Sequence, residues 1–562
     1  MLLKATELLK ARRGSLAALA AYLLLSAAFY YRPHAAGDIF NPGSDQGSFI
    51  WFLNWWPYAI THGINPFVSH FVWAPHGSNL MWSTSVPTLA LLCWPVTLVW
   101  GAETSWNLLS LAAPALDAFG CYILLRTLSR DRLPSLVGGG FFGFSTYVTA
   151  QLLGHINLSF VALVPLLAAV SVLRLRGRIG TGAYIAVFSL LLVLQFGISD
   201  EVLATSALVG LIAFATFYAR YRRDYDFLGL ALASVVSGLI AAIILSPAFY
   251  FLVKGLDELP AYLNSPTRYS ADLLNFFVPT SVIRLGRSVF VDISHRFTGN
   301  DSENGTYLGL PVFFIAVLCL RENMRKKWFW PFVIAAAATA ILSLGPRLWV
   351  NGVNTGLTLP WQAVLPLPLI RHALPVRLTM YLSLFVAVMI AVWLDVPEQT
   401  RGWRLARYVP VLLAALFLLP NPRYFHWGAI PTPPPFTRND ADRLFGHRPN
   451  LVVLPYGPLG ASMLWQIRSG MSFTMAGGYV GMNPPFFDQF PAVGYFKGAP
   501  IPADDKVFLD YVSVFCRRSH VDGIVVMPGT RPALVAALGR LPWAKTPMRG
   551  YTVIGVPKLS SP

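Results

Sequence analysis

The stretch "NPGSDQGSFIWFLNWWPYAITHGINPF" (residues 41–67) follows the first hydrophobic segment of the chain and places an acidic residue, Asp45, ahead of an aromatic, amphipathic run. Pro42 and Gly43 predict a turn, after which Asp45 occupies the position where a helix would begin. Because Trp and Tyr are enriched at membrane–water interfaces, the run after Asp45 predicts a helix that lies at such an interface. Asp45 either caps this helix, which would stabilise it by about 1 kcal/mol, or has a chemical role.

The composition is that of a polytopic membrane protein. Of the 562 residues, 55% are hydrophobic and 12% are charged, which is about half the charged share of a soluble domain. Apolar stretches recur near the length of about 20 residues that a bilayer requires. The formal net charge of +17 comes mostly from short Lys and Arg clusters between these stretches, which indicates membrane topology and no nucleic-acid partner. The four cysteines are scattered, so the sequence predicts neither a disulfide framework nor a thiolate metal site.

The basic clusters predict the topology, because cytoplasmic loops of membrane proteins carry an excess of Lys and Arg. Six clusters are expected in the cytoplasm: Arg12 and Arg13, Arg126 to Arg132, Arg174 to Arg178, Arg220 to Arg223, Arg321 to Lys327, and Arg401 to Arg407. Spans are then expected at 15–31, 105–127, 134–151, 156–173, 180–197, 202–219, 227–251, 306–320, 328–344, 376–395 and 408–420. The apolar segment 84–101 contains two prolines and is expected to lie in the outer interface or to re-enter from it without crossing. The total is about eleven transmembrane helices.

This topology predicts four parts of the chain. They are a cytoplasmic N-terminus (1–14), a membrane domain (15–420) with large outer loops at 32–104 and 253–305, a proline-rich linker (421–436) and a soluble extracytoplasmic tail (437–562). In the tail, "NLVVLPYG" and "VDGIVVMPG" predict buried strands, and "RPALVAALGRL" predicts a helix. The expected fold class is an all-α polytopic protein of the inner (plasma) membrane with a small C-terminal α/β domain.

Other charged side chains are expected on the same side of the membrane as Asp45. They are His155, Asp200, Glu201, Asp272, Glu303, Arg268, Arg371 and Arg377. Acids and bases on one side can converge on an outward-facing cavity, yet each has a structural alternative. The carboxylates can cap helices, the arginines can anchor helix ends at the interface, and the histidine can be satisfied by carbonyls or water. The two adjacent acids beside an apolar span are costly unless they face water, a cation or a substrate.

The layout of the chain resembles the GT-C superfamily of membrane glycosyltransferases, such as the protein O-mannosyltransferases and the lipid A aminoarabinose transferases. The resemblance covers roughly residues 15–420. It rests on the first span followed by a large outer loop with Asp45, on the run "WWPYAITHGINPF", on the interfacial segment 84–101 and on the multi-span body. The motifs "GHINLSFVALVPL", "YSADLLNFFVP" and "ENGTYLGL" look like those of a bacterial branch of the superfamily whose substrates are undefined.

In that superfamily an acidic residue of the first outer loop is the catalytic base, and the resemblance assigns this role to Asp45. Many relatives have two adjacent acids in this loop. Here Gln46 follows Asp45, and Asp38 lies seven residues earlier, so the identity of the second acid stays open.

The resemblance implies an inverting transfer of a sugar from a polyprenyl-phosphate donor to an extracytoplasmic glycan, lipid or protein acceptor. A carboxylate can accept the proton of the acceptor hydroxyl while positive charge develops on the sugar ring. The departing lipid phosphate needs Arg, Lys or a divalent cation, and Arg371 and Arg377 are the candidates for this contact. The remaining substrate-binding candidates are His155, Asp200, Glu201, Asp272 and Glu303.

Two other functions compete with glycosyl transfer. One is a transporter or flippase of a lipid-linked substrate without covalent chemistry, and the other is a structural membrane protein with a partner-binding tail. Transporters typically contain inverted repeats or broken helices at matched positions in two halves. The sequence shows no such symmetry, so we prefer the glycosyltransferase interpretation.

Overall fold

The computed structural model describes residues 2–129, 131–258, 263–287, 289–367, 370–395, 401–481 and 484–557. The chain divides into two compact units. The first, called the helical unit, comprises Met1–Pro33, Asn107–Ser246 and Ala261–His426; the second, called the mixed unit, comprises His34–Trp106, Pro247–Pro260 and Trp427–Pro562. The loop that follows the first span therefore belongs to the same unit as the C-terminal region. The sequence analysis placed them in separate parts of the chain.

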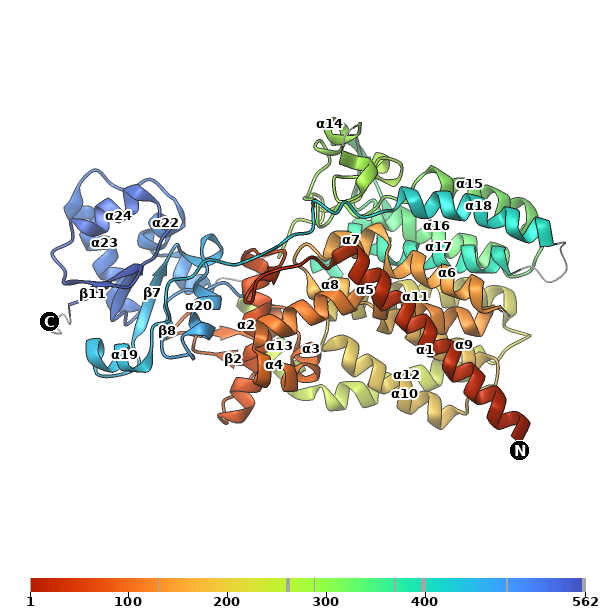
Figure 1. Ribbon diagram of the computed structural model, residues 1–562, viewed down its shortest axis with the longest axis horizontal. Coiled ribbons are helices and arrows are strands. Elements are labelled where there is room, and N and C mark those ends of the chain that lie inside the picture. The colour runs from red at the N-terminus through yellow and green to blue at the C-terminus, as the bar shows by residue number, and fades with distance from the viewer. Residues whose placement is uncertain are drawn as a thin grey trace. The chain divides into compact units, whose positions relative to one another are not determined.

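Helices occupy the segments in which the sequence predicts spans (Figure 1). They are α1 Leu2–Tyr30, α5 Ala102–Leu128, α6 Arg132–Gly143, α7 Thr146–Gln151, α8 Ile156–Ser159, α9 Leu163–Leu175, α10 Thr181–Phe196, α11 Asp200–Tyr221, α12 Phe227–Ile244, α13 Ser246–Lys254, α15 Leu310–Asn323, α16 Phe329–Ser343, α17 Thr379–Leu394 and α18 Arg401–Phe417. Three predicted spans are interrupted, after Gly143, Ser159 and Ile244.

Within the described part of the chain, six helical segments are long and apolar enough to cross a membrane. They are Arg13–Tyr30, Ala102–Leu128, Ile156–Leu175, Asp200–Tyr221, Phe227–Ile244 and Pro375–Leu394, with shorter apolar helices at Thr181–Phe196, Phe329–Ser343 and Leu405–Phe417. The protein is therefore an integral membrane protein, whereas the total of about eleven spans stays a prediction. Arg130 and the side chains of Arg12, Arg401 and Arg404, which belong to the predicted cytoplasmic clusters, lie outside the described part.

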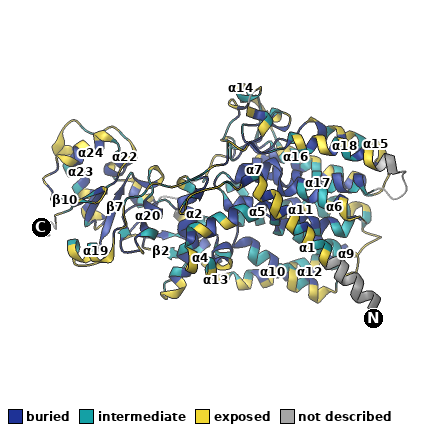
Figure 2. Cartoon of the chain, viewed as in Figure 1, coloured by how far each residue is buried: buried dark blue, intermediate teal, exposed yellow. Residues whose placement is uncertain are grey.

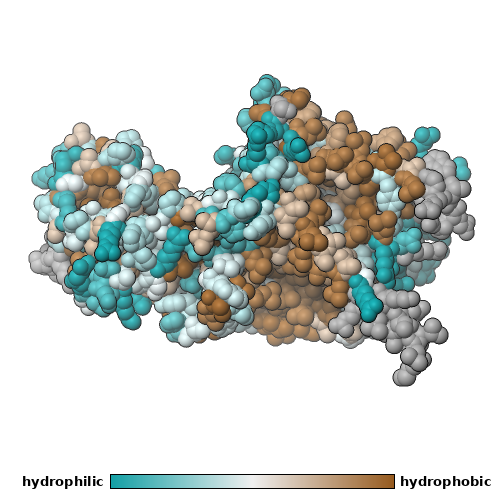
Figure 3. Space-filling model, in the orientation of Figure 1, coloured by the Kyte–Doolittle hydropathy of each residue, from teal (hydrophilic) through white to brown (hydrophobic). Residues whose placement is uncertain are grey.

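Helix α12 exposes an apolar face of the kind that contacts lipid. Its residues Leu228, Leu232, Val235, Leu239 and Ile243 are each between 60% and 73% exposed and lie on one face, three or four positions apart. Hydrophobic residues likewise cover much of the helical unit in Figure 3. Figure 2 shows its helices as mixtures of buried and exposed residues, and on α12 the buried residues are those on the opposite face. Such an apolar exterior is costly in water and stable in a bilayer.

Helix α6 packs closely against its neighbours through glycines. A Cβ atom added at Gly143 would lie 2.2 Å from the Pro114 carbonyl oxygen of α5, and one at Gly139 would lie 2.6 Å from the Ala118 carbonyl oxygen. On another side of the helix, a Cβ atom at Gly138 would lie 2.8 Å from a carbonyl oxygen of α17. Small residues allow the backbones of membrane helices to approach each other closely, so these glycines set the position of α6 between α5 and α17.

In the mixed unit, the predicted helix after Asp45 is confirmed as α2, Ser44–Thr61. Its tryptophans, however, are core residues. Trp51 and Trp55 are completely buried, and their indole Nε1 atoms donate hydrogen bonds to Gln466 Oε1 (2.8 Å) and to the Pro66 carbonyl oxygen (2.9 Å). The interfacial role expected for this run is therefore wrong for these side chains, because a buried indole with a hydrogen-bond partner fills a protein core equally well.

The other short elements of the outer loop belong to the mixed unit too. They are β1 Ile39–Phe40, which pairs with β6 Trp427–Gly428, the hairpin of β2 Val68–Ser69 and β3 Ser78–Asn79, and the helices α3 Pro87–Leu92 and α4 Trp94–Trp100. The predicted non-crossing segment 84–101 thus forms two short helices. Leu98, Val99 and Trp100 of α4 are 66–69% exposed, as expected for a helix that lies in an interface.

The C-terminal region forms a five-stranded sheet in the order β10-β11-β9-β7-β8. The strands are β7 Asn450–Leu454, β8 Thr474–Met475, β9 Gly523–Val526, β10 Lys545–Met548 and β11 Tyr551–Gly555. The helices include α20 Ser462–Arg468, α23 Asp505–Arg518 and α24 Pro532–Gly539. The parallel pair of β7 and β9 and the helix α24 confirm the strands and the helix predicted in the tail. Outer-loop backbone continues the sheet edge, since Met475 N donates to the Phe71 oxygen and Ala74 N donates to the Met475 oxygen.

The close packing of α6 yields a prediction about stability. Gly143→Ala places a methyl group where the α5 backbone lies, so we expect a loss of about 1–3 kcal/mol of stability or more. At Gly140 in the same helix, the nearest atom to an added Cβ is a Tyr22 ring carbon at 3.9 Å, so Gly140→Ala is the matched control and should be neutral. The melting temperatures of the purified full-length variants in detergent measure both. Equal melting temperatures for the two variants would contradict the proposed helix contact.

Candidate functional site

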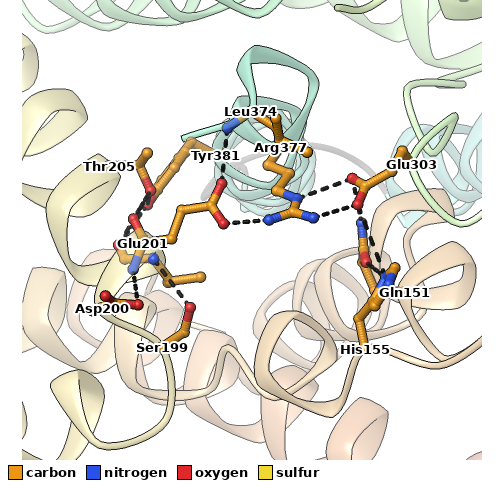
Figure 4. A network of polar contacts seen from close by, with 11 residues as sticks. Gln151, His155, Ser199, Asp200, Glu201, Thr205, Glu303, Leu374, Arg377 and Tyr381 are labelled. Atoms are coloured by element: carbon orange, nitrogen blue, oxygen red, sulfur yellow. Dashed lines mark hydrogen bonds and ion pairs between the residues drawn. The ribbon is translucent and has the colours of Figure 1, made fainter. Parts of the chain in front are cut away.

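A buried ion-pair cluster in the helical unit is centred on Arg377, which lies in the 3-10 turn Pro375–Leu378 ahead of α17. Its guanidinium lies between the carboxylates of Glu201 and Glu303 (Figure 4). Arg377 Nε donates to Glu303 Oε2 at 3.0 Å, Nη2 donates to Glu303 Oε1, and Nη1 donates to Glu201 Oε2. The exposed fractions of the three side chains are 15%, 19% and 3% for Arg377, Glu201 and Glu303. All three nitrogens of the guanidinium are therefore used by two carboxylates.

Local structure fixes both carboxylates. Glu201 lies in the first turn of α11, whose N-cap Ser199 accepts a hydrogen bond from Val202 N through its hydroxyl. The second oxygen of Glu201, Oε1, accepts a hydrogen bond from Leu374 N at 2.9 Å. Glu303 lies in a turn of the loop before α15, where its backbone N donates to Asn300 Oδ1 at 3.0 Å. The two acids thus reach Arg377 from elements about 100 residues apart in the sequence.

His155 and Gln151 extend the cluster. Gln151 Nε2 donates to Glu303 Oε2 at 3.3 Å, and His155 Nδ1 lies 2.8 Å from Gln151 Oε1. Because the amide nitrogen of Gln151 faces Glu303, its oxygen is the acceptor, and Nδ1 of His155 carries the proton. Nδ1 is also 4.0 Å from Glu303 Oε1. The imidazole therefore lies beside the acidic group and can add a positive charge to it when protonated.

The cluster contains more acid than base. One guanidinium faces two carboxylates, and Asp200 precedes Glu201 and accepts a hydrogen bond from its backbone N at 2.9 Å. Burial alone would raise the pKa of Glu303, but the charge of Arg377 and its hydrogen bonds outweigh this effect and hold that pKa below its usual value. Glu303 is therefore ionised at neutral pH. The excess of negative charge suits groups that donate hydrogen bonds.

Asp272 and Arg371, two other predicted site residues, lie in different surroundings. Asp272 is the N-cap of the 3-10 helix Leu273–Phe276, and its oxygens accept hydrogen bonds from the backbone N atoms of Leu274 (2.9 Å), Asn351 (3.0 Å) and Gly352 (2.7 Å). It therefore ties this helix to the turn of the hairpin β4 Arg347–Val350 and β5 Val353–Thr358, and the capping alternative describes it. Arg371 is half-buried, and its Nε donates to His372 Nε2 at 3.3 Å.

Asp45 lies in the mixed unit, in the first turn of α2. The N-cap of this helix is Gly43, so Asp45 is the second residue of the helix and is not its cap. A carboxylate in the first turn is nevertheless stabilised by the helix dipole. Its Oδ1 accepts a hydrogen bond of 2.7 Å from the hydroxyl of Tyr479 in the C-terminal region. The half-buried carboxylate is thus held by a side chain 434 positions away in the sequence.

The sequence analysis missed three polar residues that the structure reveals. Gln151 had a signal, because it lies four positions before His155 and such residues are neighbours on a helical turn. Asp117 had one too: it is a completely buried acid in the apolar helix α5, and its Oδ1 accepts a hydrogen bond from Val161 N (2.9 Å) at the break between α8 and α9. For Tyr479 the sequence favoured aromatic core packing over a glycan-binding role, and its hydrogen bond to Asp45 had no local signal, because this partner lies 434 positions away.

The described residues contain no group of three or more His, Cys, Asp or Glu side chains that could hold a metal ion.

Removal of the central guanidinium should destabilise the helical unit. Arg377→Ala leaves two buried carboxylates without their cationic partner, which costs about 3–5 kcal/mol. Arg371→Ala, six residues earlier, removes a half-buried guanidinium whose Nε donates to His372, and it is the control with an expected small effect. Thermal unfolding of the purified full-length variants in detergent measures the difference. A melting temperature for Arg377→Ala equal to that of Arg371→Ala would show that the cluster does not hold the fold together.

The lowered pKa of Glu303 gives this stabilisation a pH dependence. A carboxylate whose pKa is lower in the folded state stabilises the protein above the unfolded value, near 4.5, and this stabilisation disappears as the pH falls through the folded-state pKa. The melting temperature of Glu303→Gln should therefore lie below that of the wild type at neutral pH, and the gap should narrow as the pH falls below the unfolded value near 4.5 and close below the folded-state pKa. A gap that does not narrow on acidification below that unfolded value would speak against an ionised Glu303.

Comparisons with known proteins agree with the architecture. A family model described as "Domain of unknown function (DUF6311)" matches residues 15–419. No curated protein matches the chain.

Several solved structures have the same fold. The archaeal oligosaccharyltransferase AglB from Archaeoglobus fulgidus, in complex with an inhibitory peptide and a dolichol-phosphate, gives a TM-score of 0.56 at 12% identity, over 98% of this chain and 75% of that chain. The apo form of the A. fulgidus oligosaccharyltransferase gives 0.52 at 13% identity, over 91% and 69%. The arabinofuranosyltransferase AftD from Mycobacteria gives a TM-score of 0.55 at 15% identity. The matched region covers 97% of this chain and 40% of AftD. At these identities the likeness shows the fold, which is the GT-C fold that the sequence predicted.

Proposed function

The chain belongs to the DUF6311 family, and we propose that it is a membrane glycosyltransferase. It transfers a sugar from a polyprenyl-phosphate donor to a hydroxyl acceptor on the extracytoplasmic side of the plasma membrane, where we also place its C-terminal region. The GT-C fold supports the class of reaction, and the structure of AglB with a dolichol-phosphate supports a lipid phosphate as the carrier. The observation that carries the proposal is the half-buried carboxylate of Asp45, held in the first turn of α2 by the Tyr479 hydroxyl.

Asp45 acts as the general base in this mechanism. Its carboxylate accepts the proton of the acceptor hydroxyl while the hydroxyl oxygen bonds to the anomeric carbon. The bond from that carbon to the phosphate oxygen breaks, and the lipid phosphate leaves with the electron pair. A single displacement inverts the configuration at the anomeric carbon. A carboxylate close to the sugar ring also stabilises the positive charge of the oxocarbenium-like transition state.

The positive charge for the leaving phosphate is assigned to Arg371. Arg377 was the other candidate, but its three nitrogens already donate to Glu201 and Glu303. A phosphate would have to displace a carboxylate from it, at the cost of an unpaired buried acid. Arg377 is therefore a positioning residue in our proposal.

The carboxylates around Arg377 are proposed to bind substrate hydroxyls. Ionised carboxylates accept hydrogen bonds, and sugar hydroxyls donate them. Glu201 and Glu303, with Asp200 and His155 beside them, supply more acceptors than Arg377 can satisfy. Asp272 is left out of this group, because its carboxylate ties the helix Leu273–Phe276 to the hairpin of β4 and β5.

A complementation experiment tests the function and the base together. Cells that lack the protein are complemented at equal expression with the wild type or with Asp45→Asn, and surface glycans, glycolipids and glycoproteins are compared by mass spectrometry. We expect the wild type to restore a sugar mass and Asp45→Asn to lower its rate of appearance by about 10²–10⁴-fold, the usual contribution of a general base. Asp488→Asn is the control, because Asp488 belongs to the same unit, is exposed and pairs with Lys497 at the surface at 2.8 Å.

The outcomes separate the competing functions. Restoration by Asp45→Asn at the wild-type rate would remove Asp45 from the chemistry and leave the transferase class standing. If the deletion changes no glycan at all, a transporter or a structural protein becomes the better interpretation. Loss of activity in Asp488→Asn to the same degree would point to general damage of the mixed unit instead of a missing base.

A further inference from the structure

The Gly-rich motif "GGYVGMNPP" (residues 477–485) follows the two-residue strand β8 and runs into the four-residue helix α21, Pro485–Asp488, which are shorter than the strand and helix around a nucleotide-binding loop. Its described residues lie against the outer loop within the mixed unit. Trp73 N donates to the Gly477 carbonyl oxygen at 2.8 Å, and the Ser48 hydroxyl donates to the Tyr479 carbonyl oxygen. Hydrogen bonds from Trp73 and from Ser48 of α2 therefore hold the backbone around Tyr479.

The two glycines make this approach possible. A Cβ atom at Gly477 would lie 2.6 Å from a ring carbon of Tyr456, so any larger residue would displace the ring. Gly478 has a φ of +123°, which L side chains rarely adopt, and a Cβ atom there would lie 3.1 Å from Val72. Space and backbone geometry thus both require glycine immediately before Tyr479.

The result of this geometry is the hydrogen bond from the Tyr479 hydroxyl to Asp45 Oδ1, 2.7 Å long. Burial raises the pKa of Tyr479, and the negative charge of Asp45 raises it further. The phenol therefore keeps its proton and stays a donor across the physiological pH range. Hydrogen bonds to an ionised acceptor are about twice as strong as neutral ones, so this contact can fix the orientation of the carboxylate.

We propose that Tyr479 is a positioning residue for the catalytic base, supplied by the C-terminal region. This inference rests on the proposed function, in which Asp45 takes the proton of the acceptor hydroxyl. Tyr479 does not touch the reacting atoms in this scheme. It holds Asp45 in one orientation, so that the carboxylate does not have to be ordered anew in each turnover. The C-terminal region is then a part of the catalytic machinery.

The test compares Tyr479→Phe with Tyr456→Phe. Each change removes one phenol hydroxyl from the mixed unit and keeps the ring. Tyr456 is 1% exposed, and its hydroxyl donates to the Ala476 carbonyl oxygen at 3.0 Å, beside the same Gly-rich segment. The control therefore loses a buried hydrogen bond in the same place without touching Asp45.

The full-length variants are reconstituted into vesicles made from the total lipid extract of the deletion cells, which supplies unused donor, with the envelope fraction of those cells as acceptor. The initial rate of sugar incorporation is measured at increasing extract content, and the melting temperature is measured in parallel. For Tyr479→Phe we expect a maximal rate about ten- to one-hundred-fold lower, an unchanged half-saturating extract content and a melting temperature no lower than that of Tyr456→Phe. For Tyr456→Phe we expect a maximal rate near that of the wild type.

The results distinguish this inference from the proposed function. If the wild type is active, Asp45→Asn is inactive and Tyr479→Phe matches Tyr456→Phe in rate, the positioning role is overturned while the base remains. An equal fall in rate and in melting temperature for both tyrosine variants would assign Tyr479 to structure alone. If the wild type incorporates no sugar, the proposed function fails first, and the positioning role fails with it.

Discussion

The helical unit depends on the cost of a charge in an apolar surrounding. Arg377 is acceptable there because Glu201 and Glu303 neutralise it, and each acid is acceptable because Arg377 and further donors satisfy its oxygens. The start of α17, the start of α11, the loop before α15 and, through Gln151, the end of α7 therefore meet at one point. A shift of any one of these segments would leave a buried charge unpaired. The ion pairs thus fix the arrangement of segments that lie far apart in the sequence.

In the proposed function, the same cluster binds the hydroxyl groups of the substrate. With Arg377 saturated, the remaining acceptor capacity belongs to carboxylates, which attract hydroxyl groups and repel phosphate. A basic residue outside the ion pairs is needed for the donor phosphate, and this requirement is why we assign that contact to Arg371. Protonation of His155, whose Nδ1 lies 4.0 Å from Glu303 Oε1, would reduce the negative charge and so weaken the binding of hydroxyl groups.

Sequence patterns predict those features that arise from local chemistry. Apolar length predicts the helices, because a bilayer demands runs of a fixed extent, and Asp272 before an apolar run is an N-cap, the alternative that the sequence offered to a substrate-binding role. Sequence patterns do not predict the structure where two different environments favour the same residue types. The tryptophans of α2 could mark a membrane interface or a protein core, and only the position of Gln466 beside Trp51 shows that it is the core. The partners of Arg377 and Asp45 cannot be predicted from local sequence patterns either, because they lie 74 to 434 positions away.

The hydrogen bond between Asp45 and Tyr479, which are 434 positions apart in the sequence, also bears on the proposed mechanism. In a transition state with oxocarbenium character, the donor bond is largely broken before the acceptor oxygen has bonded fully, so the acceptor proton leaves late. The orientation of the base then matters more than its strength, since the proton is already acidic when it is transferred. A hydrogen bond from a rigid tyrosine to one carboxylate oxygen meets this need, because it restricts rotation without taking the negative charge away. A base held by the C-terminal region, and not by its own helix alone, is the arrangement that this chemistry favours.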